Sequence, residues 1–410
     1  MLLTLLPFAV LACGELNSDD PQQDDGPNDW HPISLTTKQA DYVASGNAFA
    51  CKFLDKVDAY ATEQKQDNWF VSPLSLQIAL GMLLNGAQGE TATEICQMLG
   101  FKANETADVN EWSKLMLTEL PKLDKKTELS LADAIFYNQK ISLKDTFKKT
   151  VGDSYAAELR ALDFSKAKAS ADVINGWCND KTKGMIPHVL DEVSSSALAY
   201  LVNALYFKSQ WQAPFPKART SSEKFTFQNG KTGKVSMMKL DGETFSYTEN
   251  NVYQLIQLPY GNGAYCMSVL LPKSGHTVKE VTALLAKEGR IPWGGRAEVD
   301  LWLPRFESKY HICLNDILSD LGMKRAFGPH ADFSSMSNTP SYVDFVQQDA
   351  AIKVDEEGTE AAAVTVIGME MTAMPSTPPK VVFHADHPFL YLITELSTGA
   401  ILFAGKYAGQ

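Results

Sequence analysis

The most distinctive side-chain spacing in the chain lies between Val354 and Lys380, in the run VDEEGTEAAAVTVIGMEMTAMPSTPPK. After an acidic turn and the glycine Gly358, small residues recur at every second position: Thr359, Ala361, Ala363 and Thr365. Residues two apart share one face of a β-strand, so this pattern suits a segment that enters a sheet without a steric barrier. The alanines would equally suit a helix. We interpret the segment as a loop in one state and a strand in another.

The residues around this alternation support the same interpretation. Gly358 supplies backbone freedom at a pivot. No proline occurs from Gly358 through Ala373, so each residue there keeps an amide that can donate to a sheet. Pro375, Pro378 and Pro379 follow and would keep the remainder out of a ladder. About twenty residues separate two strand-like runs, and a connection of that length is usually functional or disordered.

Familiar catalytic spacings do not occur in the sequence. There is no G-x-S-x-G, H-E-x-x-H, P-loop or G-x-G-x-x-G motif. His384 and His387 could suggest a metal pair, but they lack a third clustered ligand, and a structural role is the favoured interpretation. Trp177 and Trp211 are interpreted as core anchors. We therefore expect a protein that is not an enzyme and that has neither a metal nor a cofactor site.

Composition indicates a large globular protein. The 410 residues are 45% hydrophobic, which is enough for a sizeable core. A net charge of −12 argues against binding of nucleic acid by bulk electrostatics. Beyond Cys13, five cysteines show no CxxC or metal-type spacing: Cys51, Cys96, Cys178, Cys266 and Cys313. We expect buried thiols, with one disulfide as the alternative.

The first thirteen residues, MLLTLLPFAVLAC, form an apolar run that is too short to span a bilayer. They resemble a bacterial secretion signal with a lipobox, in which the cysteine is lipidated, although no basic residue precedes the run. An ordinary cleaved signal is the alternative. Residues 14–35 then read as an acidic flexible tether, and 36–410 as one domain. We expect an extracellular or cell-surface monomer, attached through lipid on Cys13 to the outer membrane of a Gram-negative bacterium.

Helical patterns dominate the first part of the domain and strands dominate the rest. Amphipathic or buried helices are predicted over Ala40–Ala61, Pro73–Asn85, Ala92–Leu99 and Val109–Thr118, and again over Ala171–Thr182 and Leu314–Leu321. Strands are predicted at Leu129–Tyr137, Leu198–Phe207, Lys224–Phe227, Tyr253–Pro259, Ala264–Leu271, Glu298–Leu303, Val381–His384, Phe389–Glu395 and Ala400–Lys406. This order predicts an α+β domain with a large sheet.

Several blocks of sequence resemble the serpin family. The run from Glu356 to Thr365 is similar to the hinge of inhibitory serpins. Further similar blocks follow in the family's order: Asn68–Ser75 with Asn85–Thr91, Asn175–Trp177 with Thr182–Ile186, Val202–Phe207 with Trp211, Phe215 and Thr220, Leu303–Phe306, His384–Leu390 and Leu402–Lys406. The resemblance covers about residues 36–408. It implies the serpin fold: helices packed on a large five-stranded, mostly antiparallel sheet, with two further sheets and an exposed reactive-centre loop.

The resemblance also implies a function. Inhibitory serpins present the loop as a substrate, form an acyl-enzyme with a serine protease, and trap it by inserting the loop into the sheet. The implied hinge consists of Glu356, Glu357, Gly358, Thr359, Glu360, Ala361, Ala362, Ala363 and Thr365. The implied gate of the sheet consists of Ser72, Ser75, Asn203 and Gln348, with Trp211 at the breach where the loop enters. Gln348 replaces a histidine that is frequent in the family.

The implied reactive bond is Thr372–Ala373, fourteen residues after the hinge glycine. Met371 is an alternative, and counting back from the strand at Phe383 favours Met374, but Pro375 would hinder cleavage there. No Lys, Arg or aromatic residue lies between Val354 and Pro379, so an elastase-like or subtilisin-like target is favoured over a trypsin-like one. A Glu-directed protease acting at Glu370 and a cysteine protease remain alternatives. The alternative function is a serpin-fold binding protein that is cleaved without trapping the protease.

Overall fold

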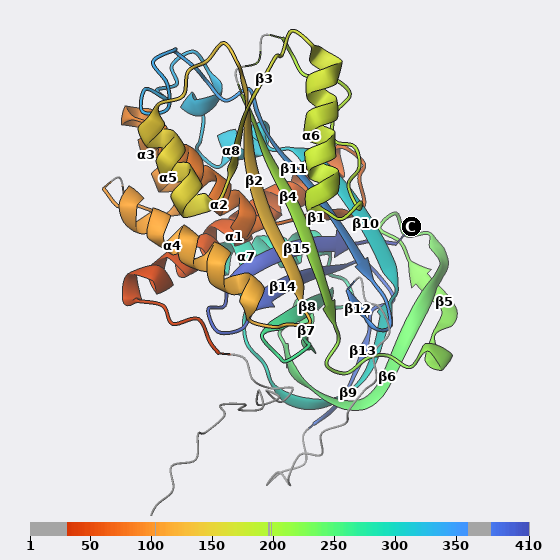
Figure 1. Ribbon diagram of the computed structural model, residues 1–410. Helices are drawn as coiled ribbons and strands as arrows, with labels where there is room; N and C mark the ends of the chain where they lie inside the picture. The colour runs from red at the N-terminus through yellow and green to blue at the C-terminus, as the bar shows by residue number, and fades with distance from the viewer. Residues whose placement is uncertain (1–30, 103, 196, 198, 360–378, 410) are drawn as a thin grey trace, which may run out of the picture.

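The computed structural model describes residues 31–102, 104–195, 197, 199–359 and 379–409 (Figure 1). The predicted signal, most of the tether, and the predicted reactive bond therefore lie outside the described residues. None of the described helices is both long enough and apolar enough to cross a membrane.

The helices and strands agree with the predicted order of helices followed by strands. The helices are α1 (Thr37–Glu63), α2 (Pro73–Leu84), α3 (Gly89–Leu99), α4 (Thr106–Glu119), α5 (Asp145–Tyr155), α6 (Ala167–Lys181), α7 (Val278–Glu288) and α8 (Asn315–Asp320), with short 3-10 helices η1 (Leu120–Lys122), η2 (Lys217–Arg219) and η3 (Arg325–Phe327). The strands are β1 (Trp69–Val71), β2 (Glu128–Asn138), β3 (Glu158–Leu162), β4 (Ala199–Gln210), β5 (Ser221–Thr226), β6 (Thr232–Glu249), β7 (Tyr253–Tyr260), β8 (Tyr265–Pro272), β9 (Gly295–Pro304), β10 (Phe306–Cys313), β11 (Phe345–Val354), β12 (Gly358–Thr359), β13 (Lys380–His384), β14 (Phe389–Glu395) and β15 (Ile401–Tyr407).

Local sequence accounts for the first two helices. Thr36 forms a capping box with Gln39 and begins α1. Ser72 caps α2, and Pro73 occupies the first position of that helix, where its missing amide costs nothing. All twelve residues of α2 are buried, as its apolar sequence predicts. The elements missed by the sequence patterns include α5, α7, β6 and β10.

The larger of the two described sheets has nine strands in the order β1-β15-β14-β8-β7-β6-β9-β13, with β5 paired to β6. The family resemblance implied two separate smaller sheets, whereas here they are continuous. The reason lies in β6, which is 18 residues long and pairs with β9 on both sides of a register shift between Leu240 and Glu243. Before the shift β6 also pairs with β5, and after it with β7.

The second described sheet has six strands in the order β10-β11-β12-β4-β2-β3. The two-residue strand β12 adds the sixth strand to the five that were expected. The pairs β11–β4 and β2–β3 are parallel, and the other pairs of this sheet are antiparallel. This sheet contains the candidate functional site.

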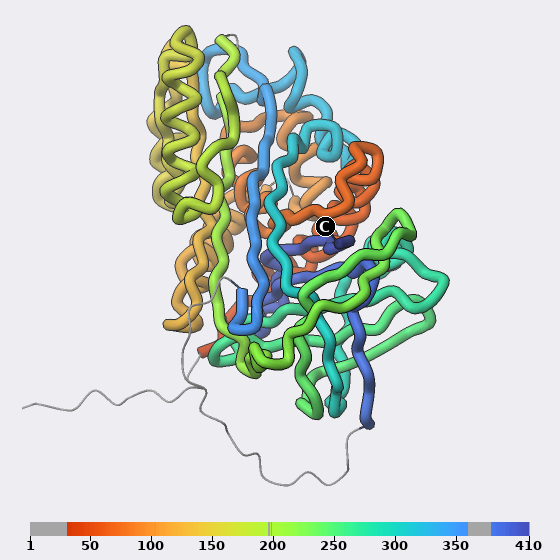
Figure 2. The backbone as a smooth tube through the Cα atoms, turned by 90° about the vertical axis from the view of Figure 1, so that its right-hand side faces the viewer, coloured from red at the N-terminus to blue at the C-terminus, as the bar shows by residue number. Residues whose placement is uncertain are grey.

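Two hydrophobic clusters cover the two faces of the six-stranded sheet. Its inner face belongs to the main core, which includes Leu201 and Leu205 of β4 and the buried residues of α1 and α2. Its outer face packs under α6 through a separate cluster that includes Phe136, Val202 and Trp177. Figure 2 shows α6 on one side of these strands and the orange helices α1 and α2 on the other.

The cysteine prediction is partly wrong. The five cysteines of the domain are free, and four of them are buried, but Cys313 is exposed. Cys313 ends β10, along which burial alternates strictly, and it falls on the solvent side of that alternation.

Candidate functional site

The candidate site is the seam between β4 and β11 in the centre of the six-stranded sheet. These strands pair in parallel from Tyr200 opposite Phe345 to Ala204 opposite Asp349. Toward their carboxyl ends they separate, and β12 lies between them, antiparallel to both. Thr359 is opposite Ser209 on one side and Val354 on the other. Gly358 and Thr359 of the predicted hinge thus already form a strand within the sheet.

The core-facing orientation of Thr359 is set by a buried aromatic pair. Thr359 is fully buried, and its hydroxyl hydrogen-bonds the hydroxyl of Tyr260 at 2.6 Å. The Tyr260 ring stacks on Trp211, with ring centroids 4.4 Å apart. The side chain of Thr359 therefore points to the inner face of the sheet, beside the two rings.

Gly358 is required by the close approach of β4. A Cβ atom at this position would lie 2.1 Å from the carbonyl oxygen of Ser209 and 2.7 Å from Cα of Gln210, and its φ is +155°. Both neighbours are backbone atoms, so a side chain would push the two strands apart. The pivot predicted from sequence is thus a place where only glycine fits.

The acidic turn before Gly358 is fastened to the segment 211–220. Trp211 donates its indole N–H to the carbonyl oxygen of Asp355 at 2.9 Å and its amide N–H to that of Glu357 at 2.9 Å. Glu356 is 2% exposed, accepts from the Thr220 hydroxyl at 2.5 Å and forms an ion pair with Arg305. Burial opposes ionisation of Glu356, but these two donors outweigh it and hold its pKa below the ordinary value. Trp211, the residue that the resemblance assigned to the breach, thus anchors this turn.

The four predicted gate residues lie together in one hydrogen-bonded cluster across the seam. The Gln348 amide accepts from the Ser72 backbone N–H at 2.8 Å and donates to the Ser72 carbonyl oxygen at 3.0 Å. It also donates to Oδ1 of Asn203 at 3.1 Å, which joins β11 to β4. Asn203 in turn donates to the hydroxyl of Ser75. Gln348 therefore donates across the seam to Asn203, and it uses both its donor and its acceptor on the backbone of Ser72.

Asp133 on β2 is a further member of this cluster that the sequence reasoning missed. It is 4% exposed, and its Oδ1 accepts from Asn203 Nδ2 at 2.9 Å, while Oδ2 has no partner among the described residues. Burial raises the pKa of Asp133 to about 7, against the smaller opposing effect of the Asn203 hydrogen bond. Strand alternation could have shown that Asp133 faces the core, because it is in phase with the core-facing Leu129 and Ile135, but not that it contacts Asn203.

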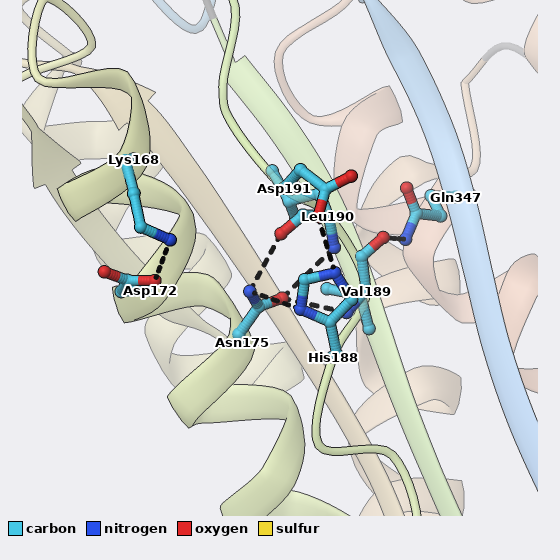
Figure 3. A network of polar contacts seen from close by, with 8 residues as sticks. All are labelled: Lys168, Asp172, Asn175, His188, Val189, Leu190, Asp191 and Gln347. Carbon is cyan, nitrogen blue, oxygen red and sulfur yellow. Dashed lines mark hydrogen bonds and ion pairs between the residues drawn. The ribbon is translucent and has the colours of Figure 1, made fainter.

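On the outer face, the connection from α6 to β4 crosses the sheet (Figure 3). Oδ1 of Asn175 accepts from the amides of Val189 at 2.8 Å and Leu190 at 3.1 Å, and its Nδ2 donates to the Leu190 carbonyl oxygen at 2.8 Å. Gln347 of β11 donates to the Val189 carbonyl oxygen at 3.4 Å. Residues 188–191 are therefore held to both α6 and β11.

Other predicted residues lie outside the described part of the chain or apart from the seam. The hinge residues Glu360, Ala361, Ala362, Ala363 and Thr365, the reactive-bond candidates Met371, Thr372, Ala373 and Met374, and Cys13 are not described. His384 and His387 are apart from the seam: His387 contacts Asp386 and the Pro272 carbonyl oxygen, each at 2.8 Å. No cluster of three potential metal ligands occurs within residues 31–359 and 379–409 that the structure describes.

Comparisons with known proteins agree on one family. A family described as "Serpin (serine protease inhibitor)" matches residues 44–409. The Bos taurus protein Serpin A3-1 is 33% identical over 354 residues, covering 84% of each chain. An uncharacterized serpin-like protein of Thermococcus kodakarensis is 32% identical over 422 residues, covering 99% of this chain and 97% of its own.

Solved structures give the same result. The native thermophilic serpin tengpin superposes with a TM-score of 0.81 at 27% identity, covering 93% of this chain and 96% of its own. Human thyroxine-binding globulin superposes with a TM-score of 0.80 at 26% identity, covering 91% of this chain and 99% of its own.

Proposed function

This chain belongs to the serpin family, and on that premise we propose that it inhibits serine proteases by suicide trapping, with insertion of its loop between β4 and β11. Family membership supports a protease-inhibitor function in general. The observation that carries the finer proposal is β12, because Gly358 and Thr359 of the hinge already pair with β4 and Thr359 also pairs with β11.

The register of β12 can be extended along the seam. Counting from Thr359, Ala361 comes opposite Phe207 and Ile352, and Thr365 comes opposite Asn203 and Gln348. Thr359 already faces the core. The next two residues on the same face of the extended strand, Ala361 and Ala363, are also small. The side-chain amides of Gln348 and Asn203 now hydrogen-bond each other across the seam, and insertion breaks this bond. In the extended register the hydroxyl of Thr365 lies between these two amides, so it can replace the lost hydrogen bond.

The proposed reaction uses the chemistry of the target protease. Its serine Oγ adds to the carbonyl carbon of Thr372, the bond to Ala373 breaks, and the proton from the serine goes to the new amine of Ala373. An ester then joins Thr372 to the protease. Insertion of the released loop carries the protease along the sheet and distorts its active site, so that water does not complete hydrolysis of the ester. The intact fold is kinetically stabilised in this proposal.

The length of the seam supports the bond at Thr372. β4 begins at Ala199, which is opposite residue 369 in the extended register, so residues 370–372 remain to link the strand to the protease. The absence of Lys, Arg and aromatic side chains in the loop supports an elastase-like or subtilisin-like target.

A denaturing gel tests this proposal. The protein is mixed with an elastase and with a subtilisin, and trypsin serves as the control protease. We expect a covalent complex with one of the first two, and a released C-terminal fragment that begins at Ala373 by mass spectrometry. Cleavage of the loop without a covalent band would instead favour a binding protein that does not trap its protease; thyroxine-binding globulin is a binding protein by its name.

We also propose attachment to a membrane through Cys13, with the protein outside the cell. The support is the apolar run that ends in Cys13 and the acidic stretch after it. Acyl chains contribute about 0.8 kcal/mol per buried methylene, so two or more chains would hold the protein at a bilayer. A Cys13→Ser variant should leave the membrane fraction, and its retention there would contradict the anchor.

A further inference from the structure

The seam has an apolar cavity at the end opposite to β12. Its lining includes Leu83 at the end of α2, Ile135 of β2, Ala199 and Leu201 of β4, and Met336 and Tyr342 of the segment before β11. Tyr342 is 40% exposed and is one of three exposed large hydrophobic residues in the described chain. An apolar hollow with an exposed aromatic at its edge is incompletely covered.

We infer that this cavity receives the side chain of Met369 when the loop has entered the sheet. The inference rests on the proposed function, because it requires insertion to run the full length of the seam. The occupant is a segment of this chain: residues 360–378 connect Thr359 in β12 to Pro379, immediately before β13, and the cavity lies along the path of the extended strand.

The register identifies Met369 as the residue that reaches the cavity. Continuing the β12–β4 pairing from Thr359 opposite Ser209 brings residue 369 opposite Ala199, which lines the cavity. Because 359 and 369 differ by an even number, both side chains face the inner side of the sheet, where Thr359 contacts Tyr260. Ile367, on the same face, arrives opposite Leu201, which also lines the cavity.

Side-chain sizes match along this path. The strand begins with small inner residues, Ala361 and Ala363, beside the packed core, and turns large and apolar at Ile367 and Met369, where apolar side chains line the cavity. Ala199 is small at the position opposite Met369. An unbranched methionine can adapt to an irregular space of this kind. The cavity thus lies where Met369, the last residue that can pair with β4, brings its side chain.

A matched pair of aspartate substitutions tests the inference. Met369→Asp and Met371→Asp differ only in position, and residue 371 lies beyond the start of β4 on the same face of the strand. Both are made in a Thr372→Arg background, so that trypsin can cut a loop that otherwise contains no Lys or Arg, with mass spectrometry verifying a single cut. The measured quantity is the rise in Tm that cutting produces.

We expect the parent and the Met371→Asp variant to gain thermal stability alike on cutting, and the Met369→Asp variant to lose most of that gain. An equal gain in all three would overturn the cavity assignment while leaving loop insertion intact. No gain in any of them would overturn insertion itself, and with it the proposed function.

A fluorescence readout does not depend on the stability of the variants. Met369→Trp should shift its emission to shorter wavelength when the loop is cut, because the indole enters an apolar site, whereas Met371→Trp should not. A shift at residue 371 without one at residue 369 would contradict the register and overturn the inference.

Discussion

Replacing Asp133 with asparagine should abolish a specific pH dependence of stability. Asp133 is buried in the gate cluster, where one carboxylate oxygen accepts from Asn203 and the other has no partner among the described residues. Burial raises its pKa from the ordinary 3.8 to about 7. Asp133 is therefore protonated in the folded protein at pH 5 but ionised in the unfolded chain. The neighbouring Tyr155 is neutral throughout, because burial raises its own pKa well above the ordinary value.

The sign and size follow from proton linkage. Between pH 4 and pH 7 the folded state binds one more proton at this site than the unfolded state, so stability falls as the pH rises and is constant above about pH 7. The pKa values of Asp133 in the folded and unfolded states differ by about three pH units, which corresponds to a change of about 4 kcal/mol in the free energy of unfolding. Asparagine keeps the acceptor for Asn203 and does not titrate. The free energy of unfolding of the Asp133→Asn variant should equal that of the parent near pH 4 and should be higher by up to about 4 kcal/mol at pH 8.

Urea unfolding at pH 4 to 8 measures this difference for the parent and the variant in parallel. Other ionisable groups, such as Glu356 with its lowered pKa, contribute to both curves and cancel in the comparison. Curves that stay parallel over the whole range would refute the reasoning, because they would mean that Asp133 ionises in the folded protein without cost.

Three further substitutions test other parts of the account. Thr359→Arg should turn the inhibitor into a substrate, since the site beside Tyr260 is fully buried, whereas Thr359→Ser should still form the covalent complex on a denaturing gel; inhibition by the arginine variant would contradict insertion. Lys406→Met should destabilise the protein by about 3–5 kcal/mol in urea, because it leaves the Asp58 charge buried and unpaired, and Asp58→Leu in addition should recover most of that loss. Asn175→Ala should cost about 2 kcal/mol through three lost hydrogen bonds to residues 189 and 190, and an unchanged urea midpoint would show that this connection is not fastened as described.

Local sequence patterns predicted most of the fold. Periodicity located α1, α2, β2, β4 and the three C-terminal strands, because each has a regular alternation or a long apolar run. The continuity of the nine-stranded sheet was not predictable in this way. It depends on how β6 pairs with β9 across the shift after Leu240, and such pairing is a long-range property.

The candidate site was predicted in part. Gly358 and the alternation that begins at Thr359 indicated a strand-forming hinge, and the family resemblance supplied the gate residues. That β12 already occupies the carboxyl end of the seam, and that Asp133 joins the gate, required the three-dimensional structure. Asp133 lies far along the chain from Asn203, and only the pairing of β2 with β4 brings them together.

Amide hydrogen exchange before and after a single cut in the loop tests the central claim most directly. If the loop inserts between β4 and β11, peptides that cover residues 360–369 should become protected to the level of β4 after the cut, and the amides of β4 and β11 should themselves slow. If those peptides exchange equally fast before and after the cut, the loop does not enter the seam, and trapping by insertion is contradicted.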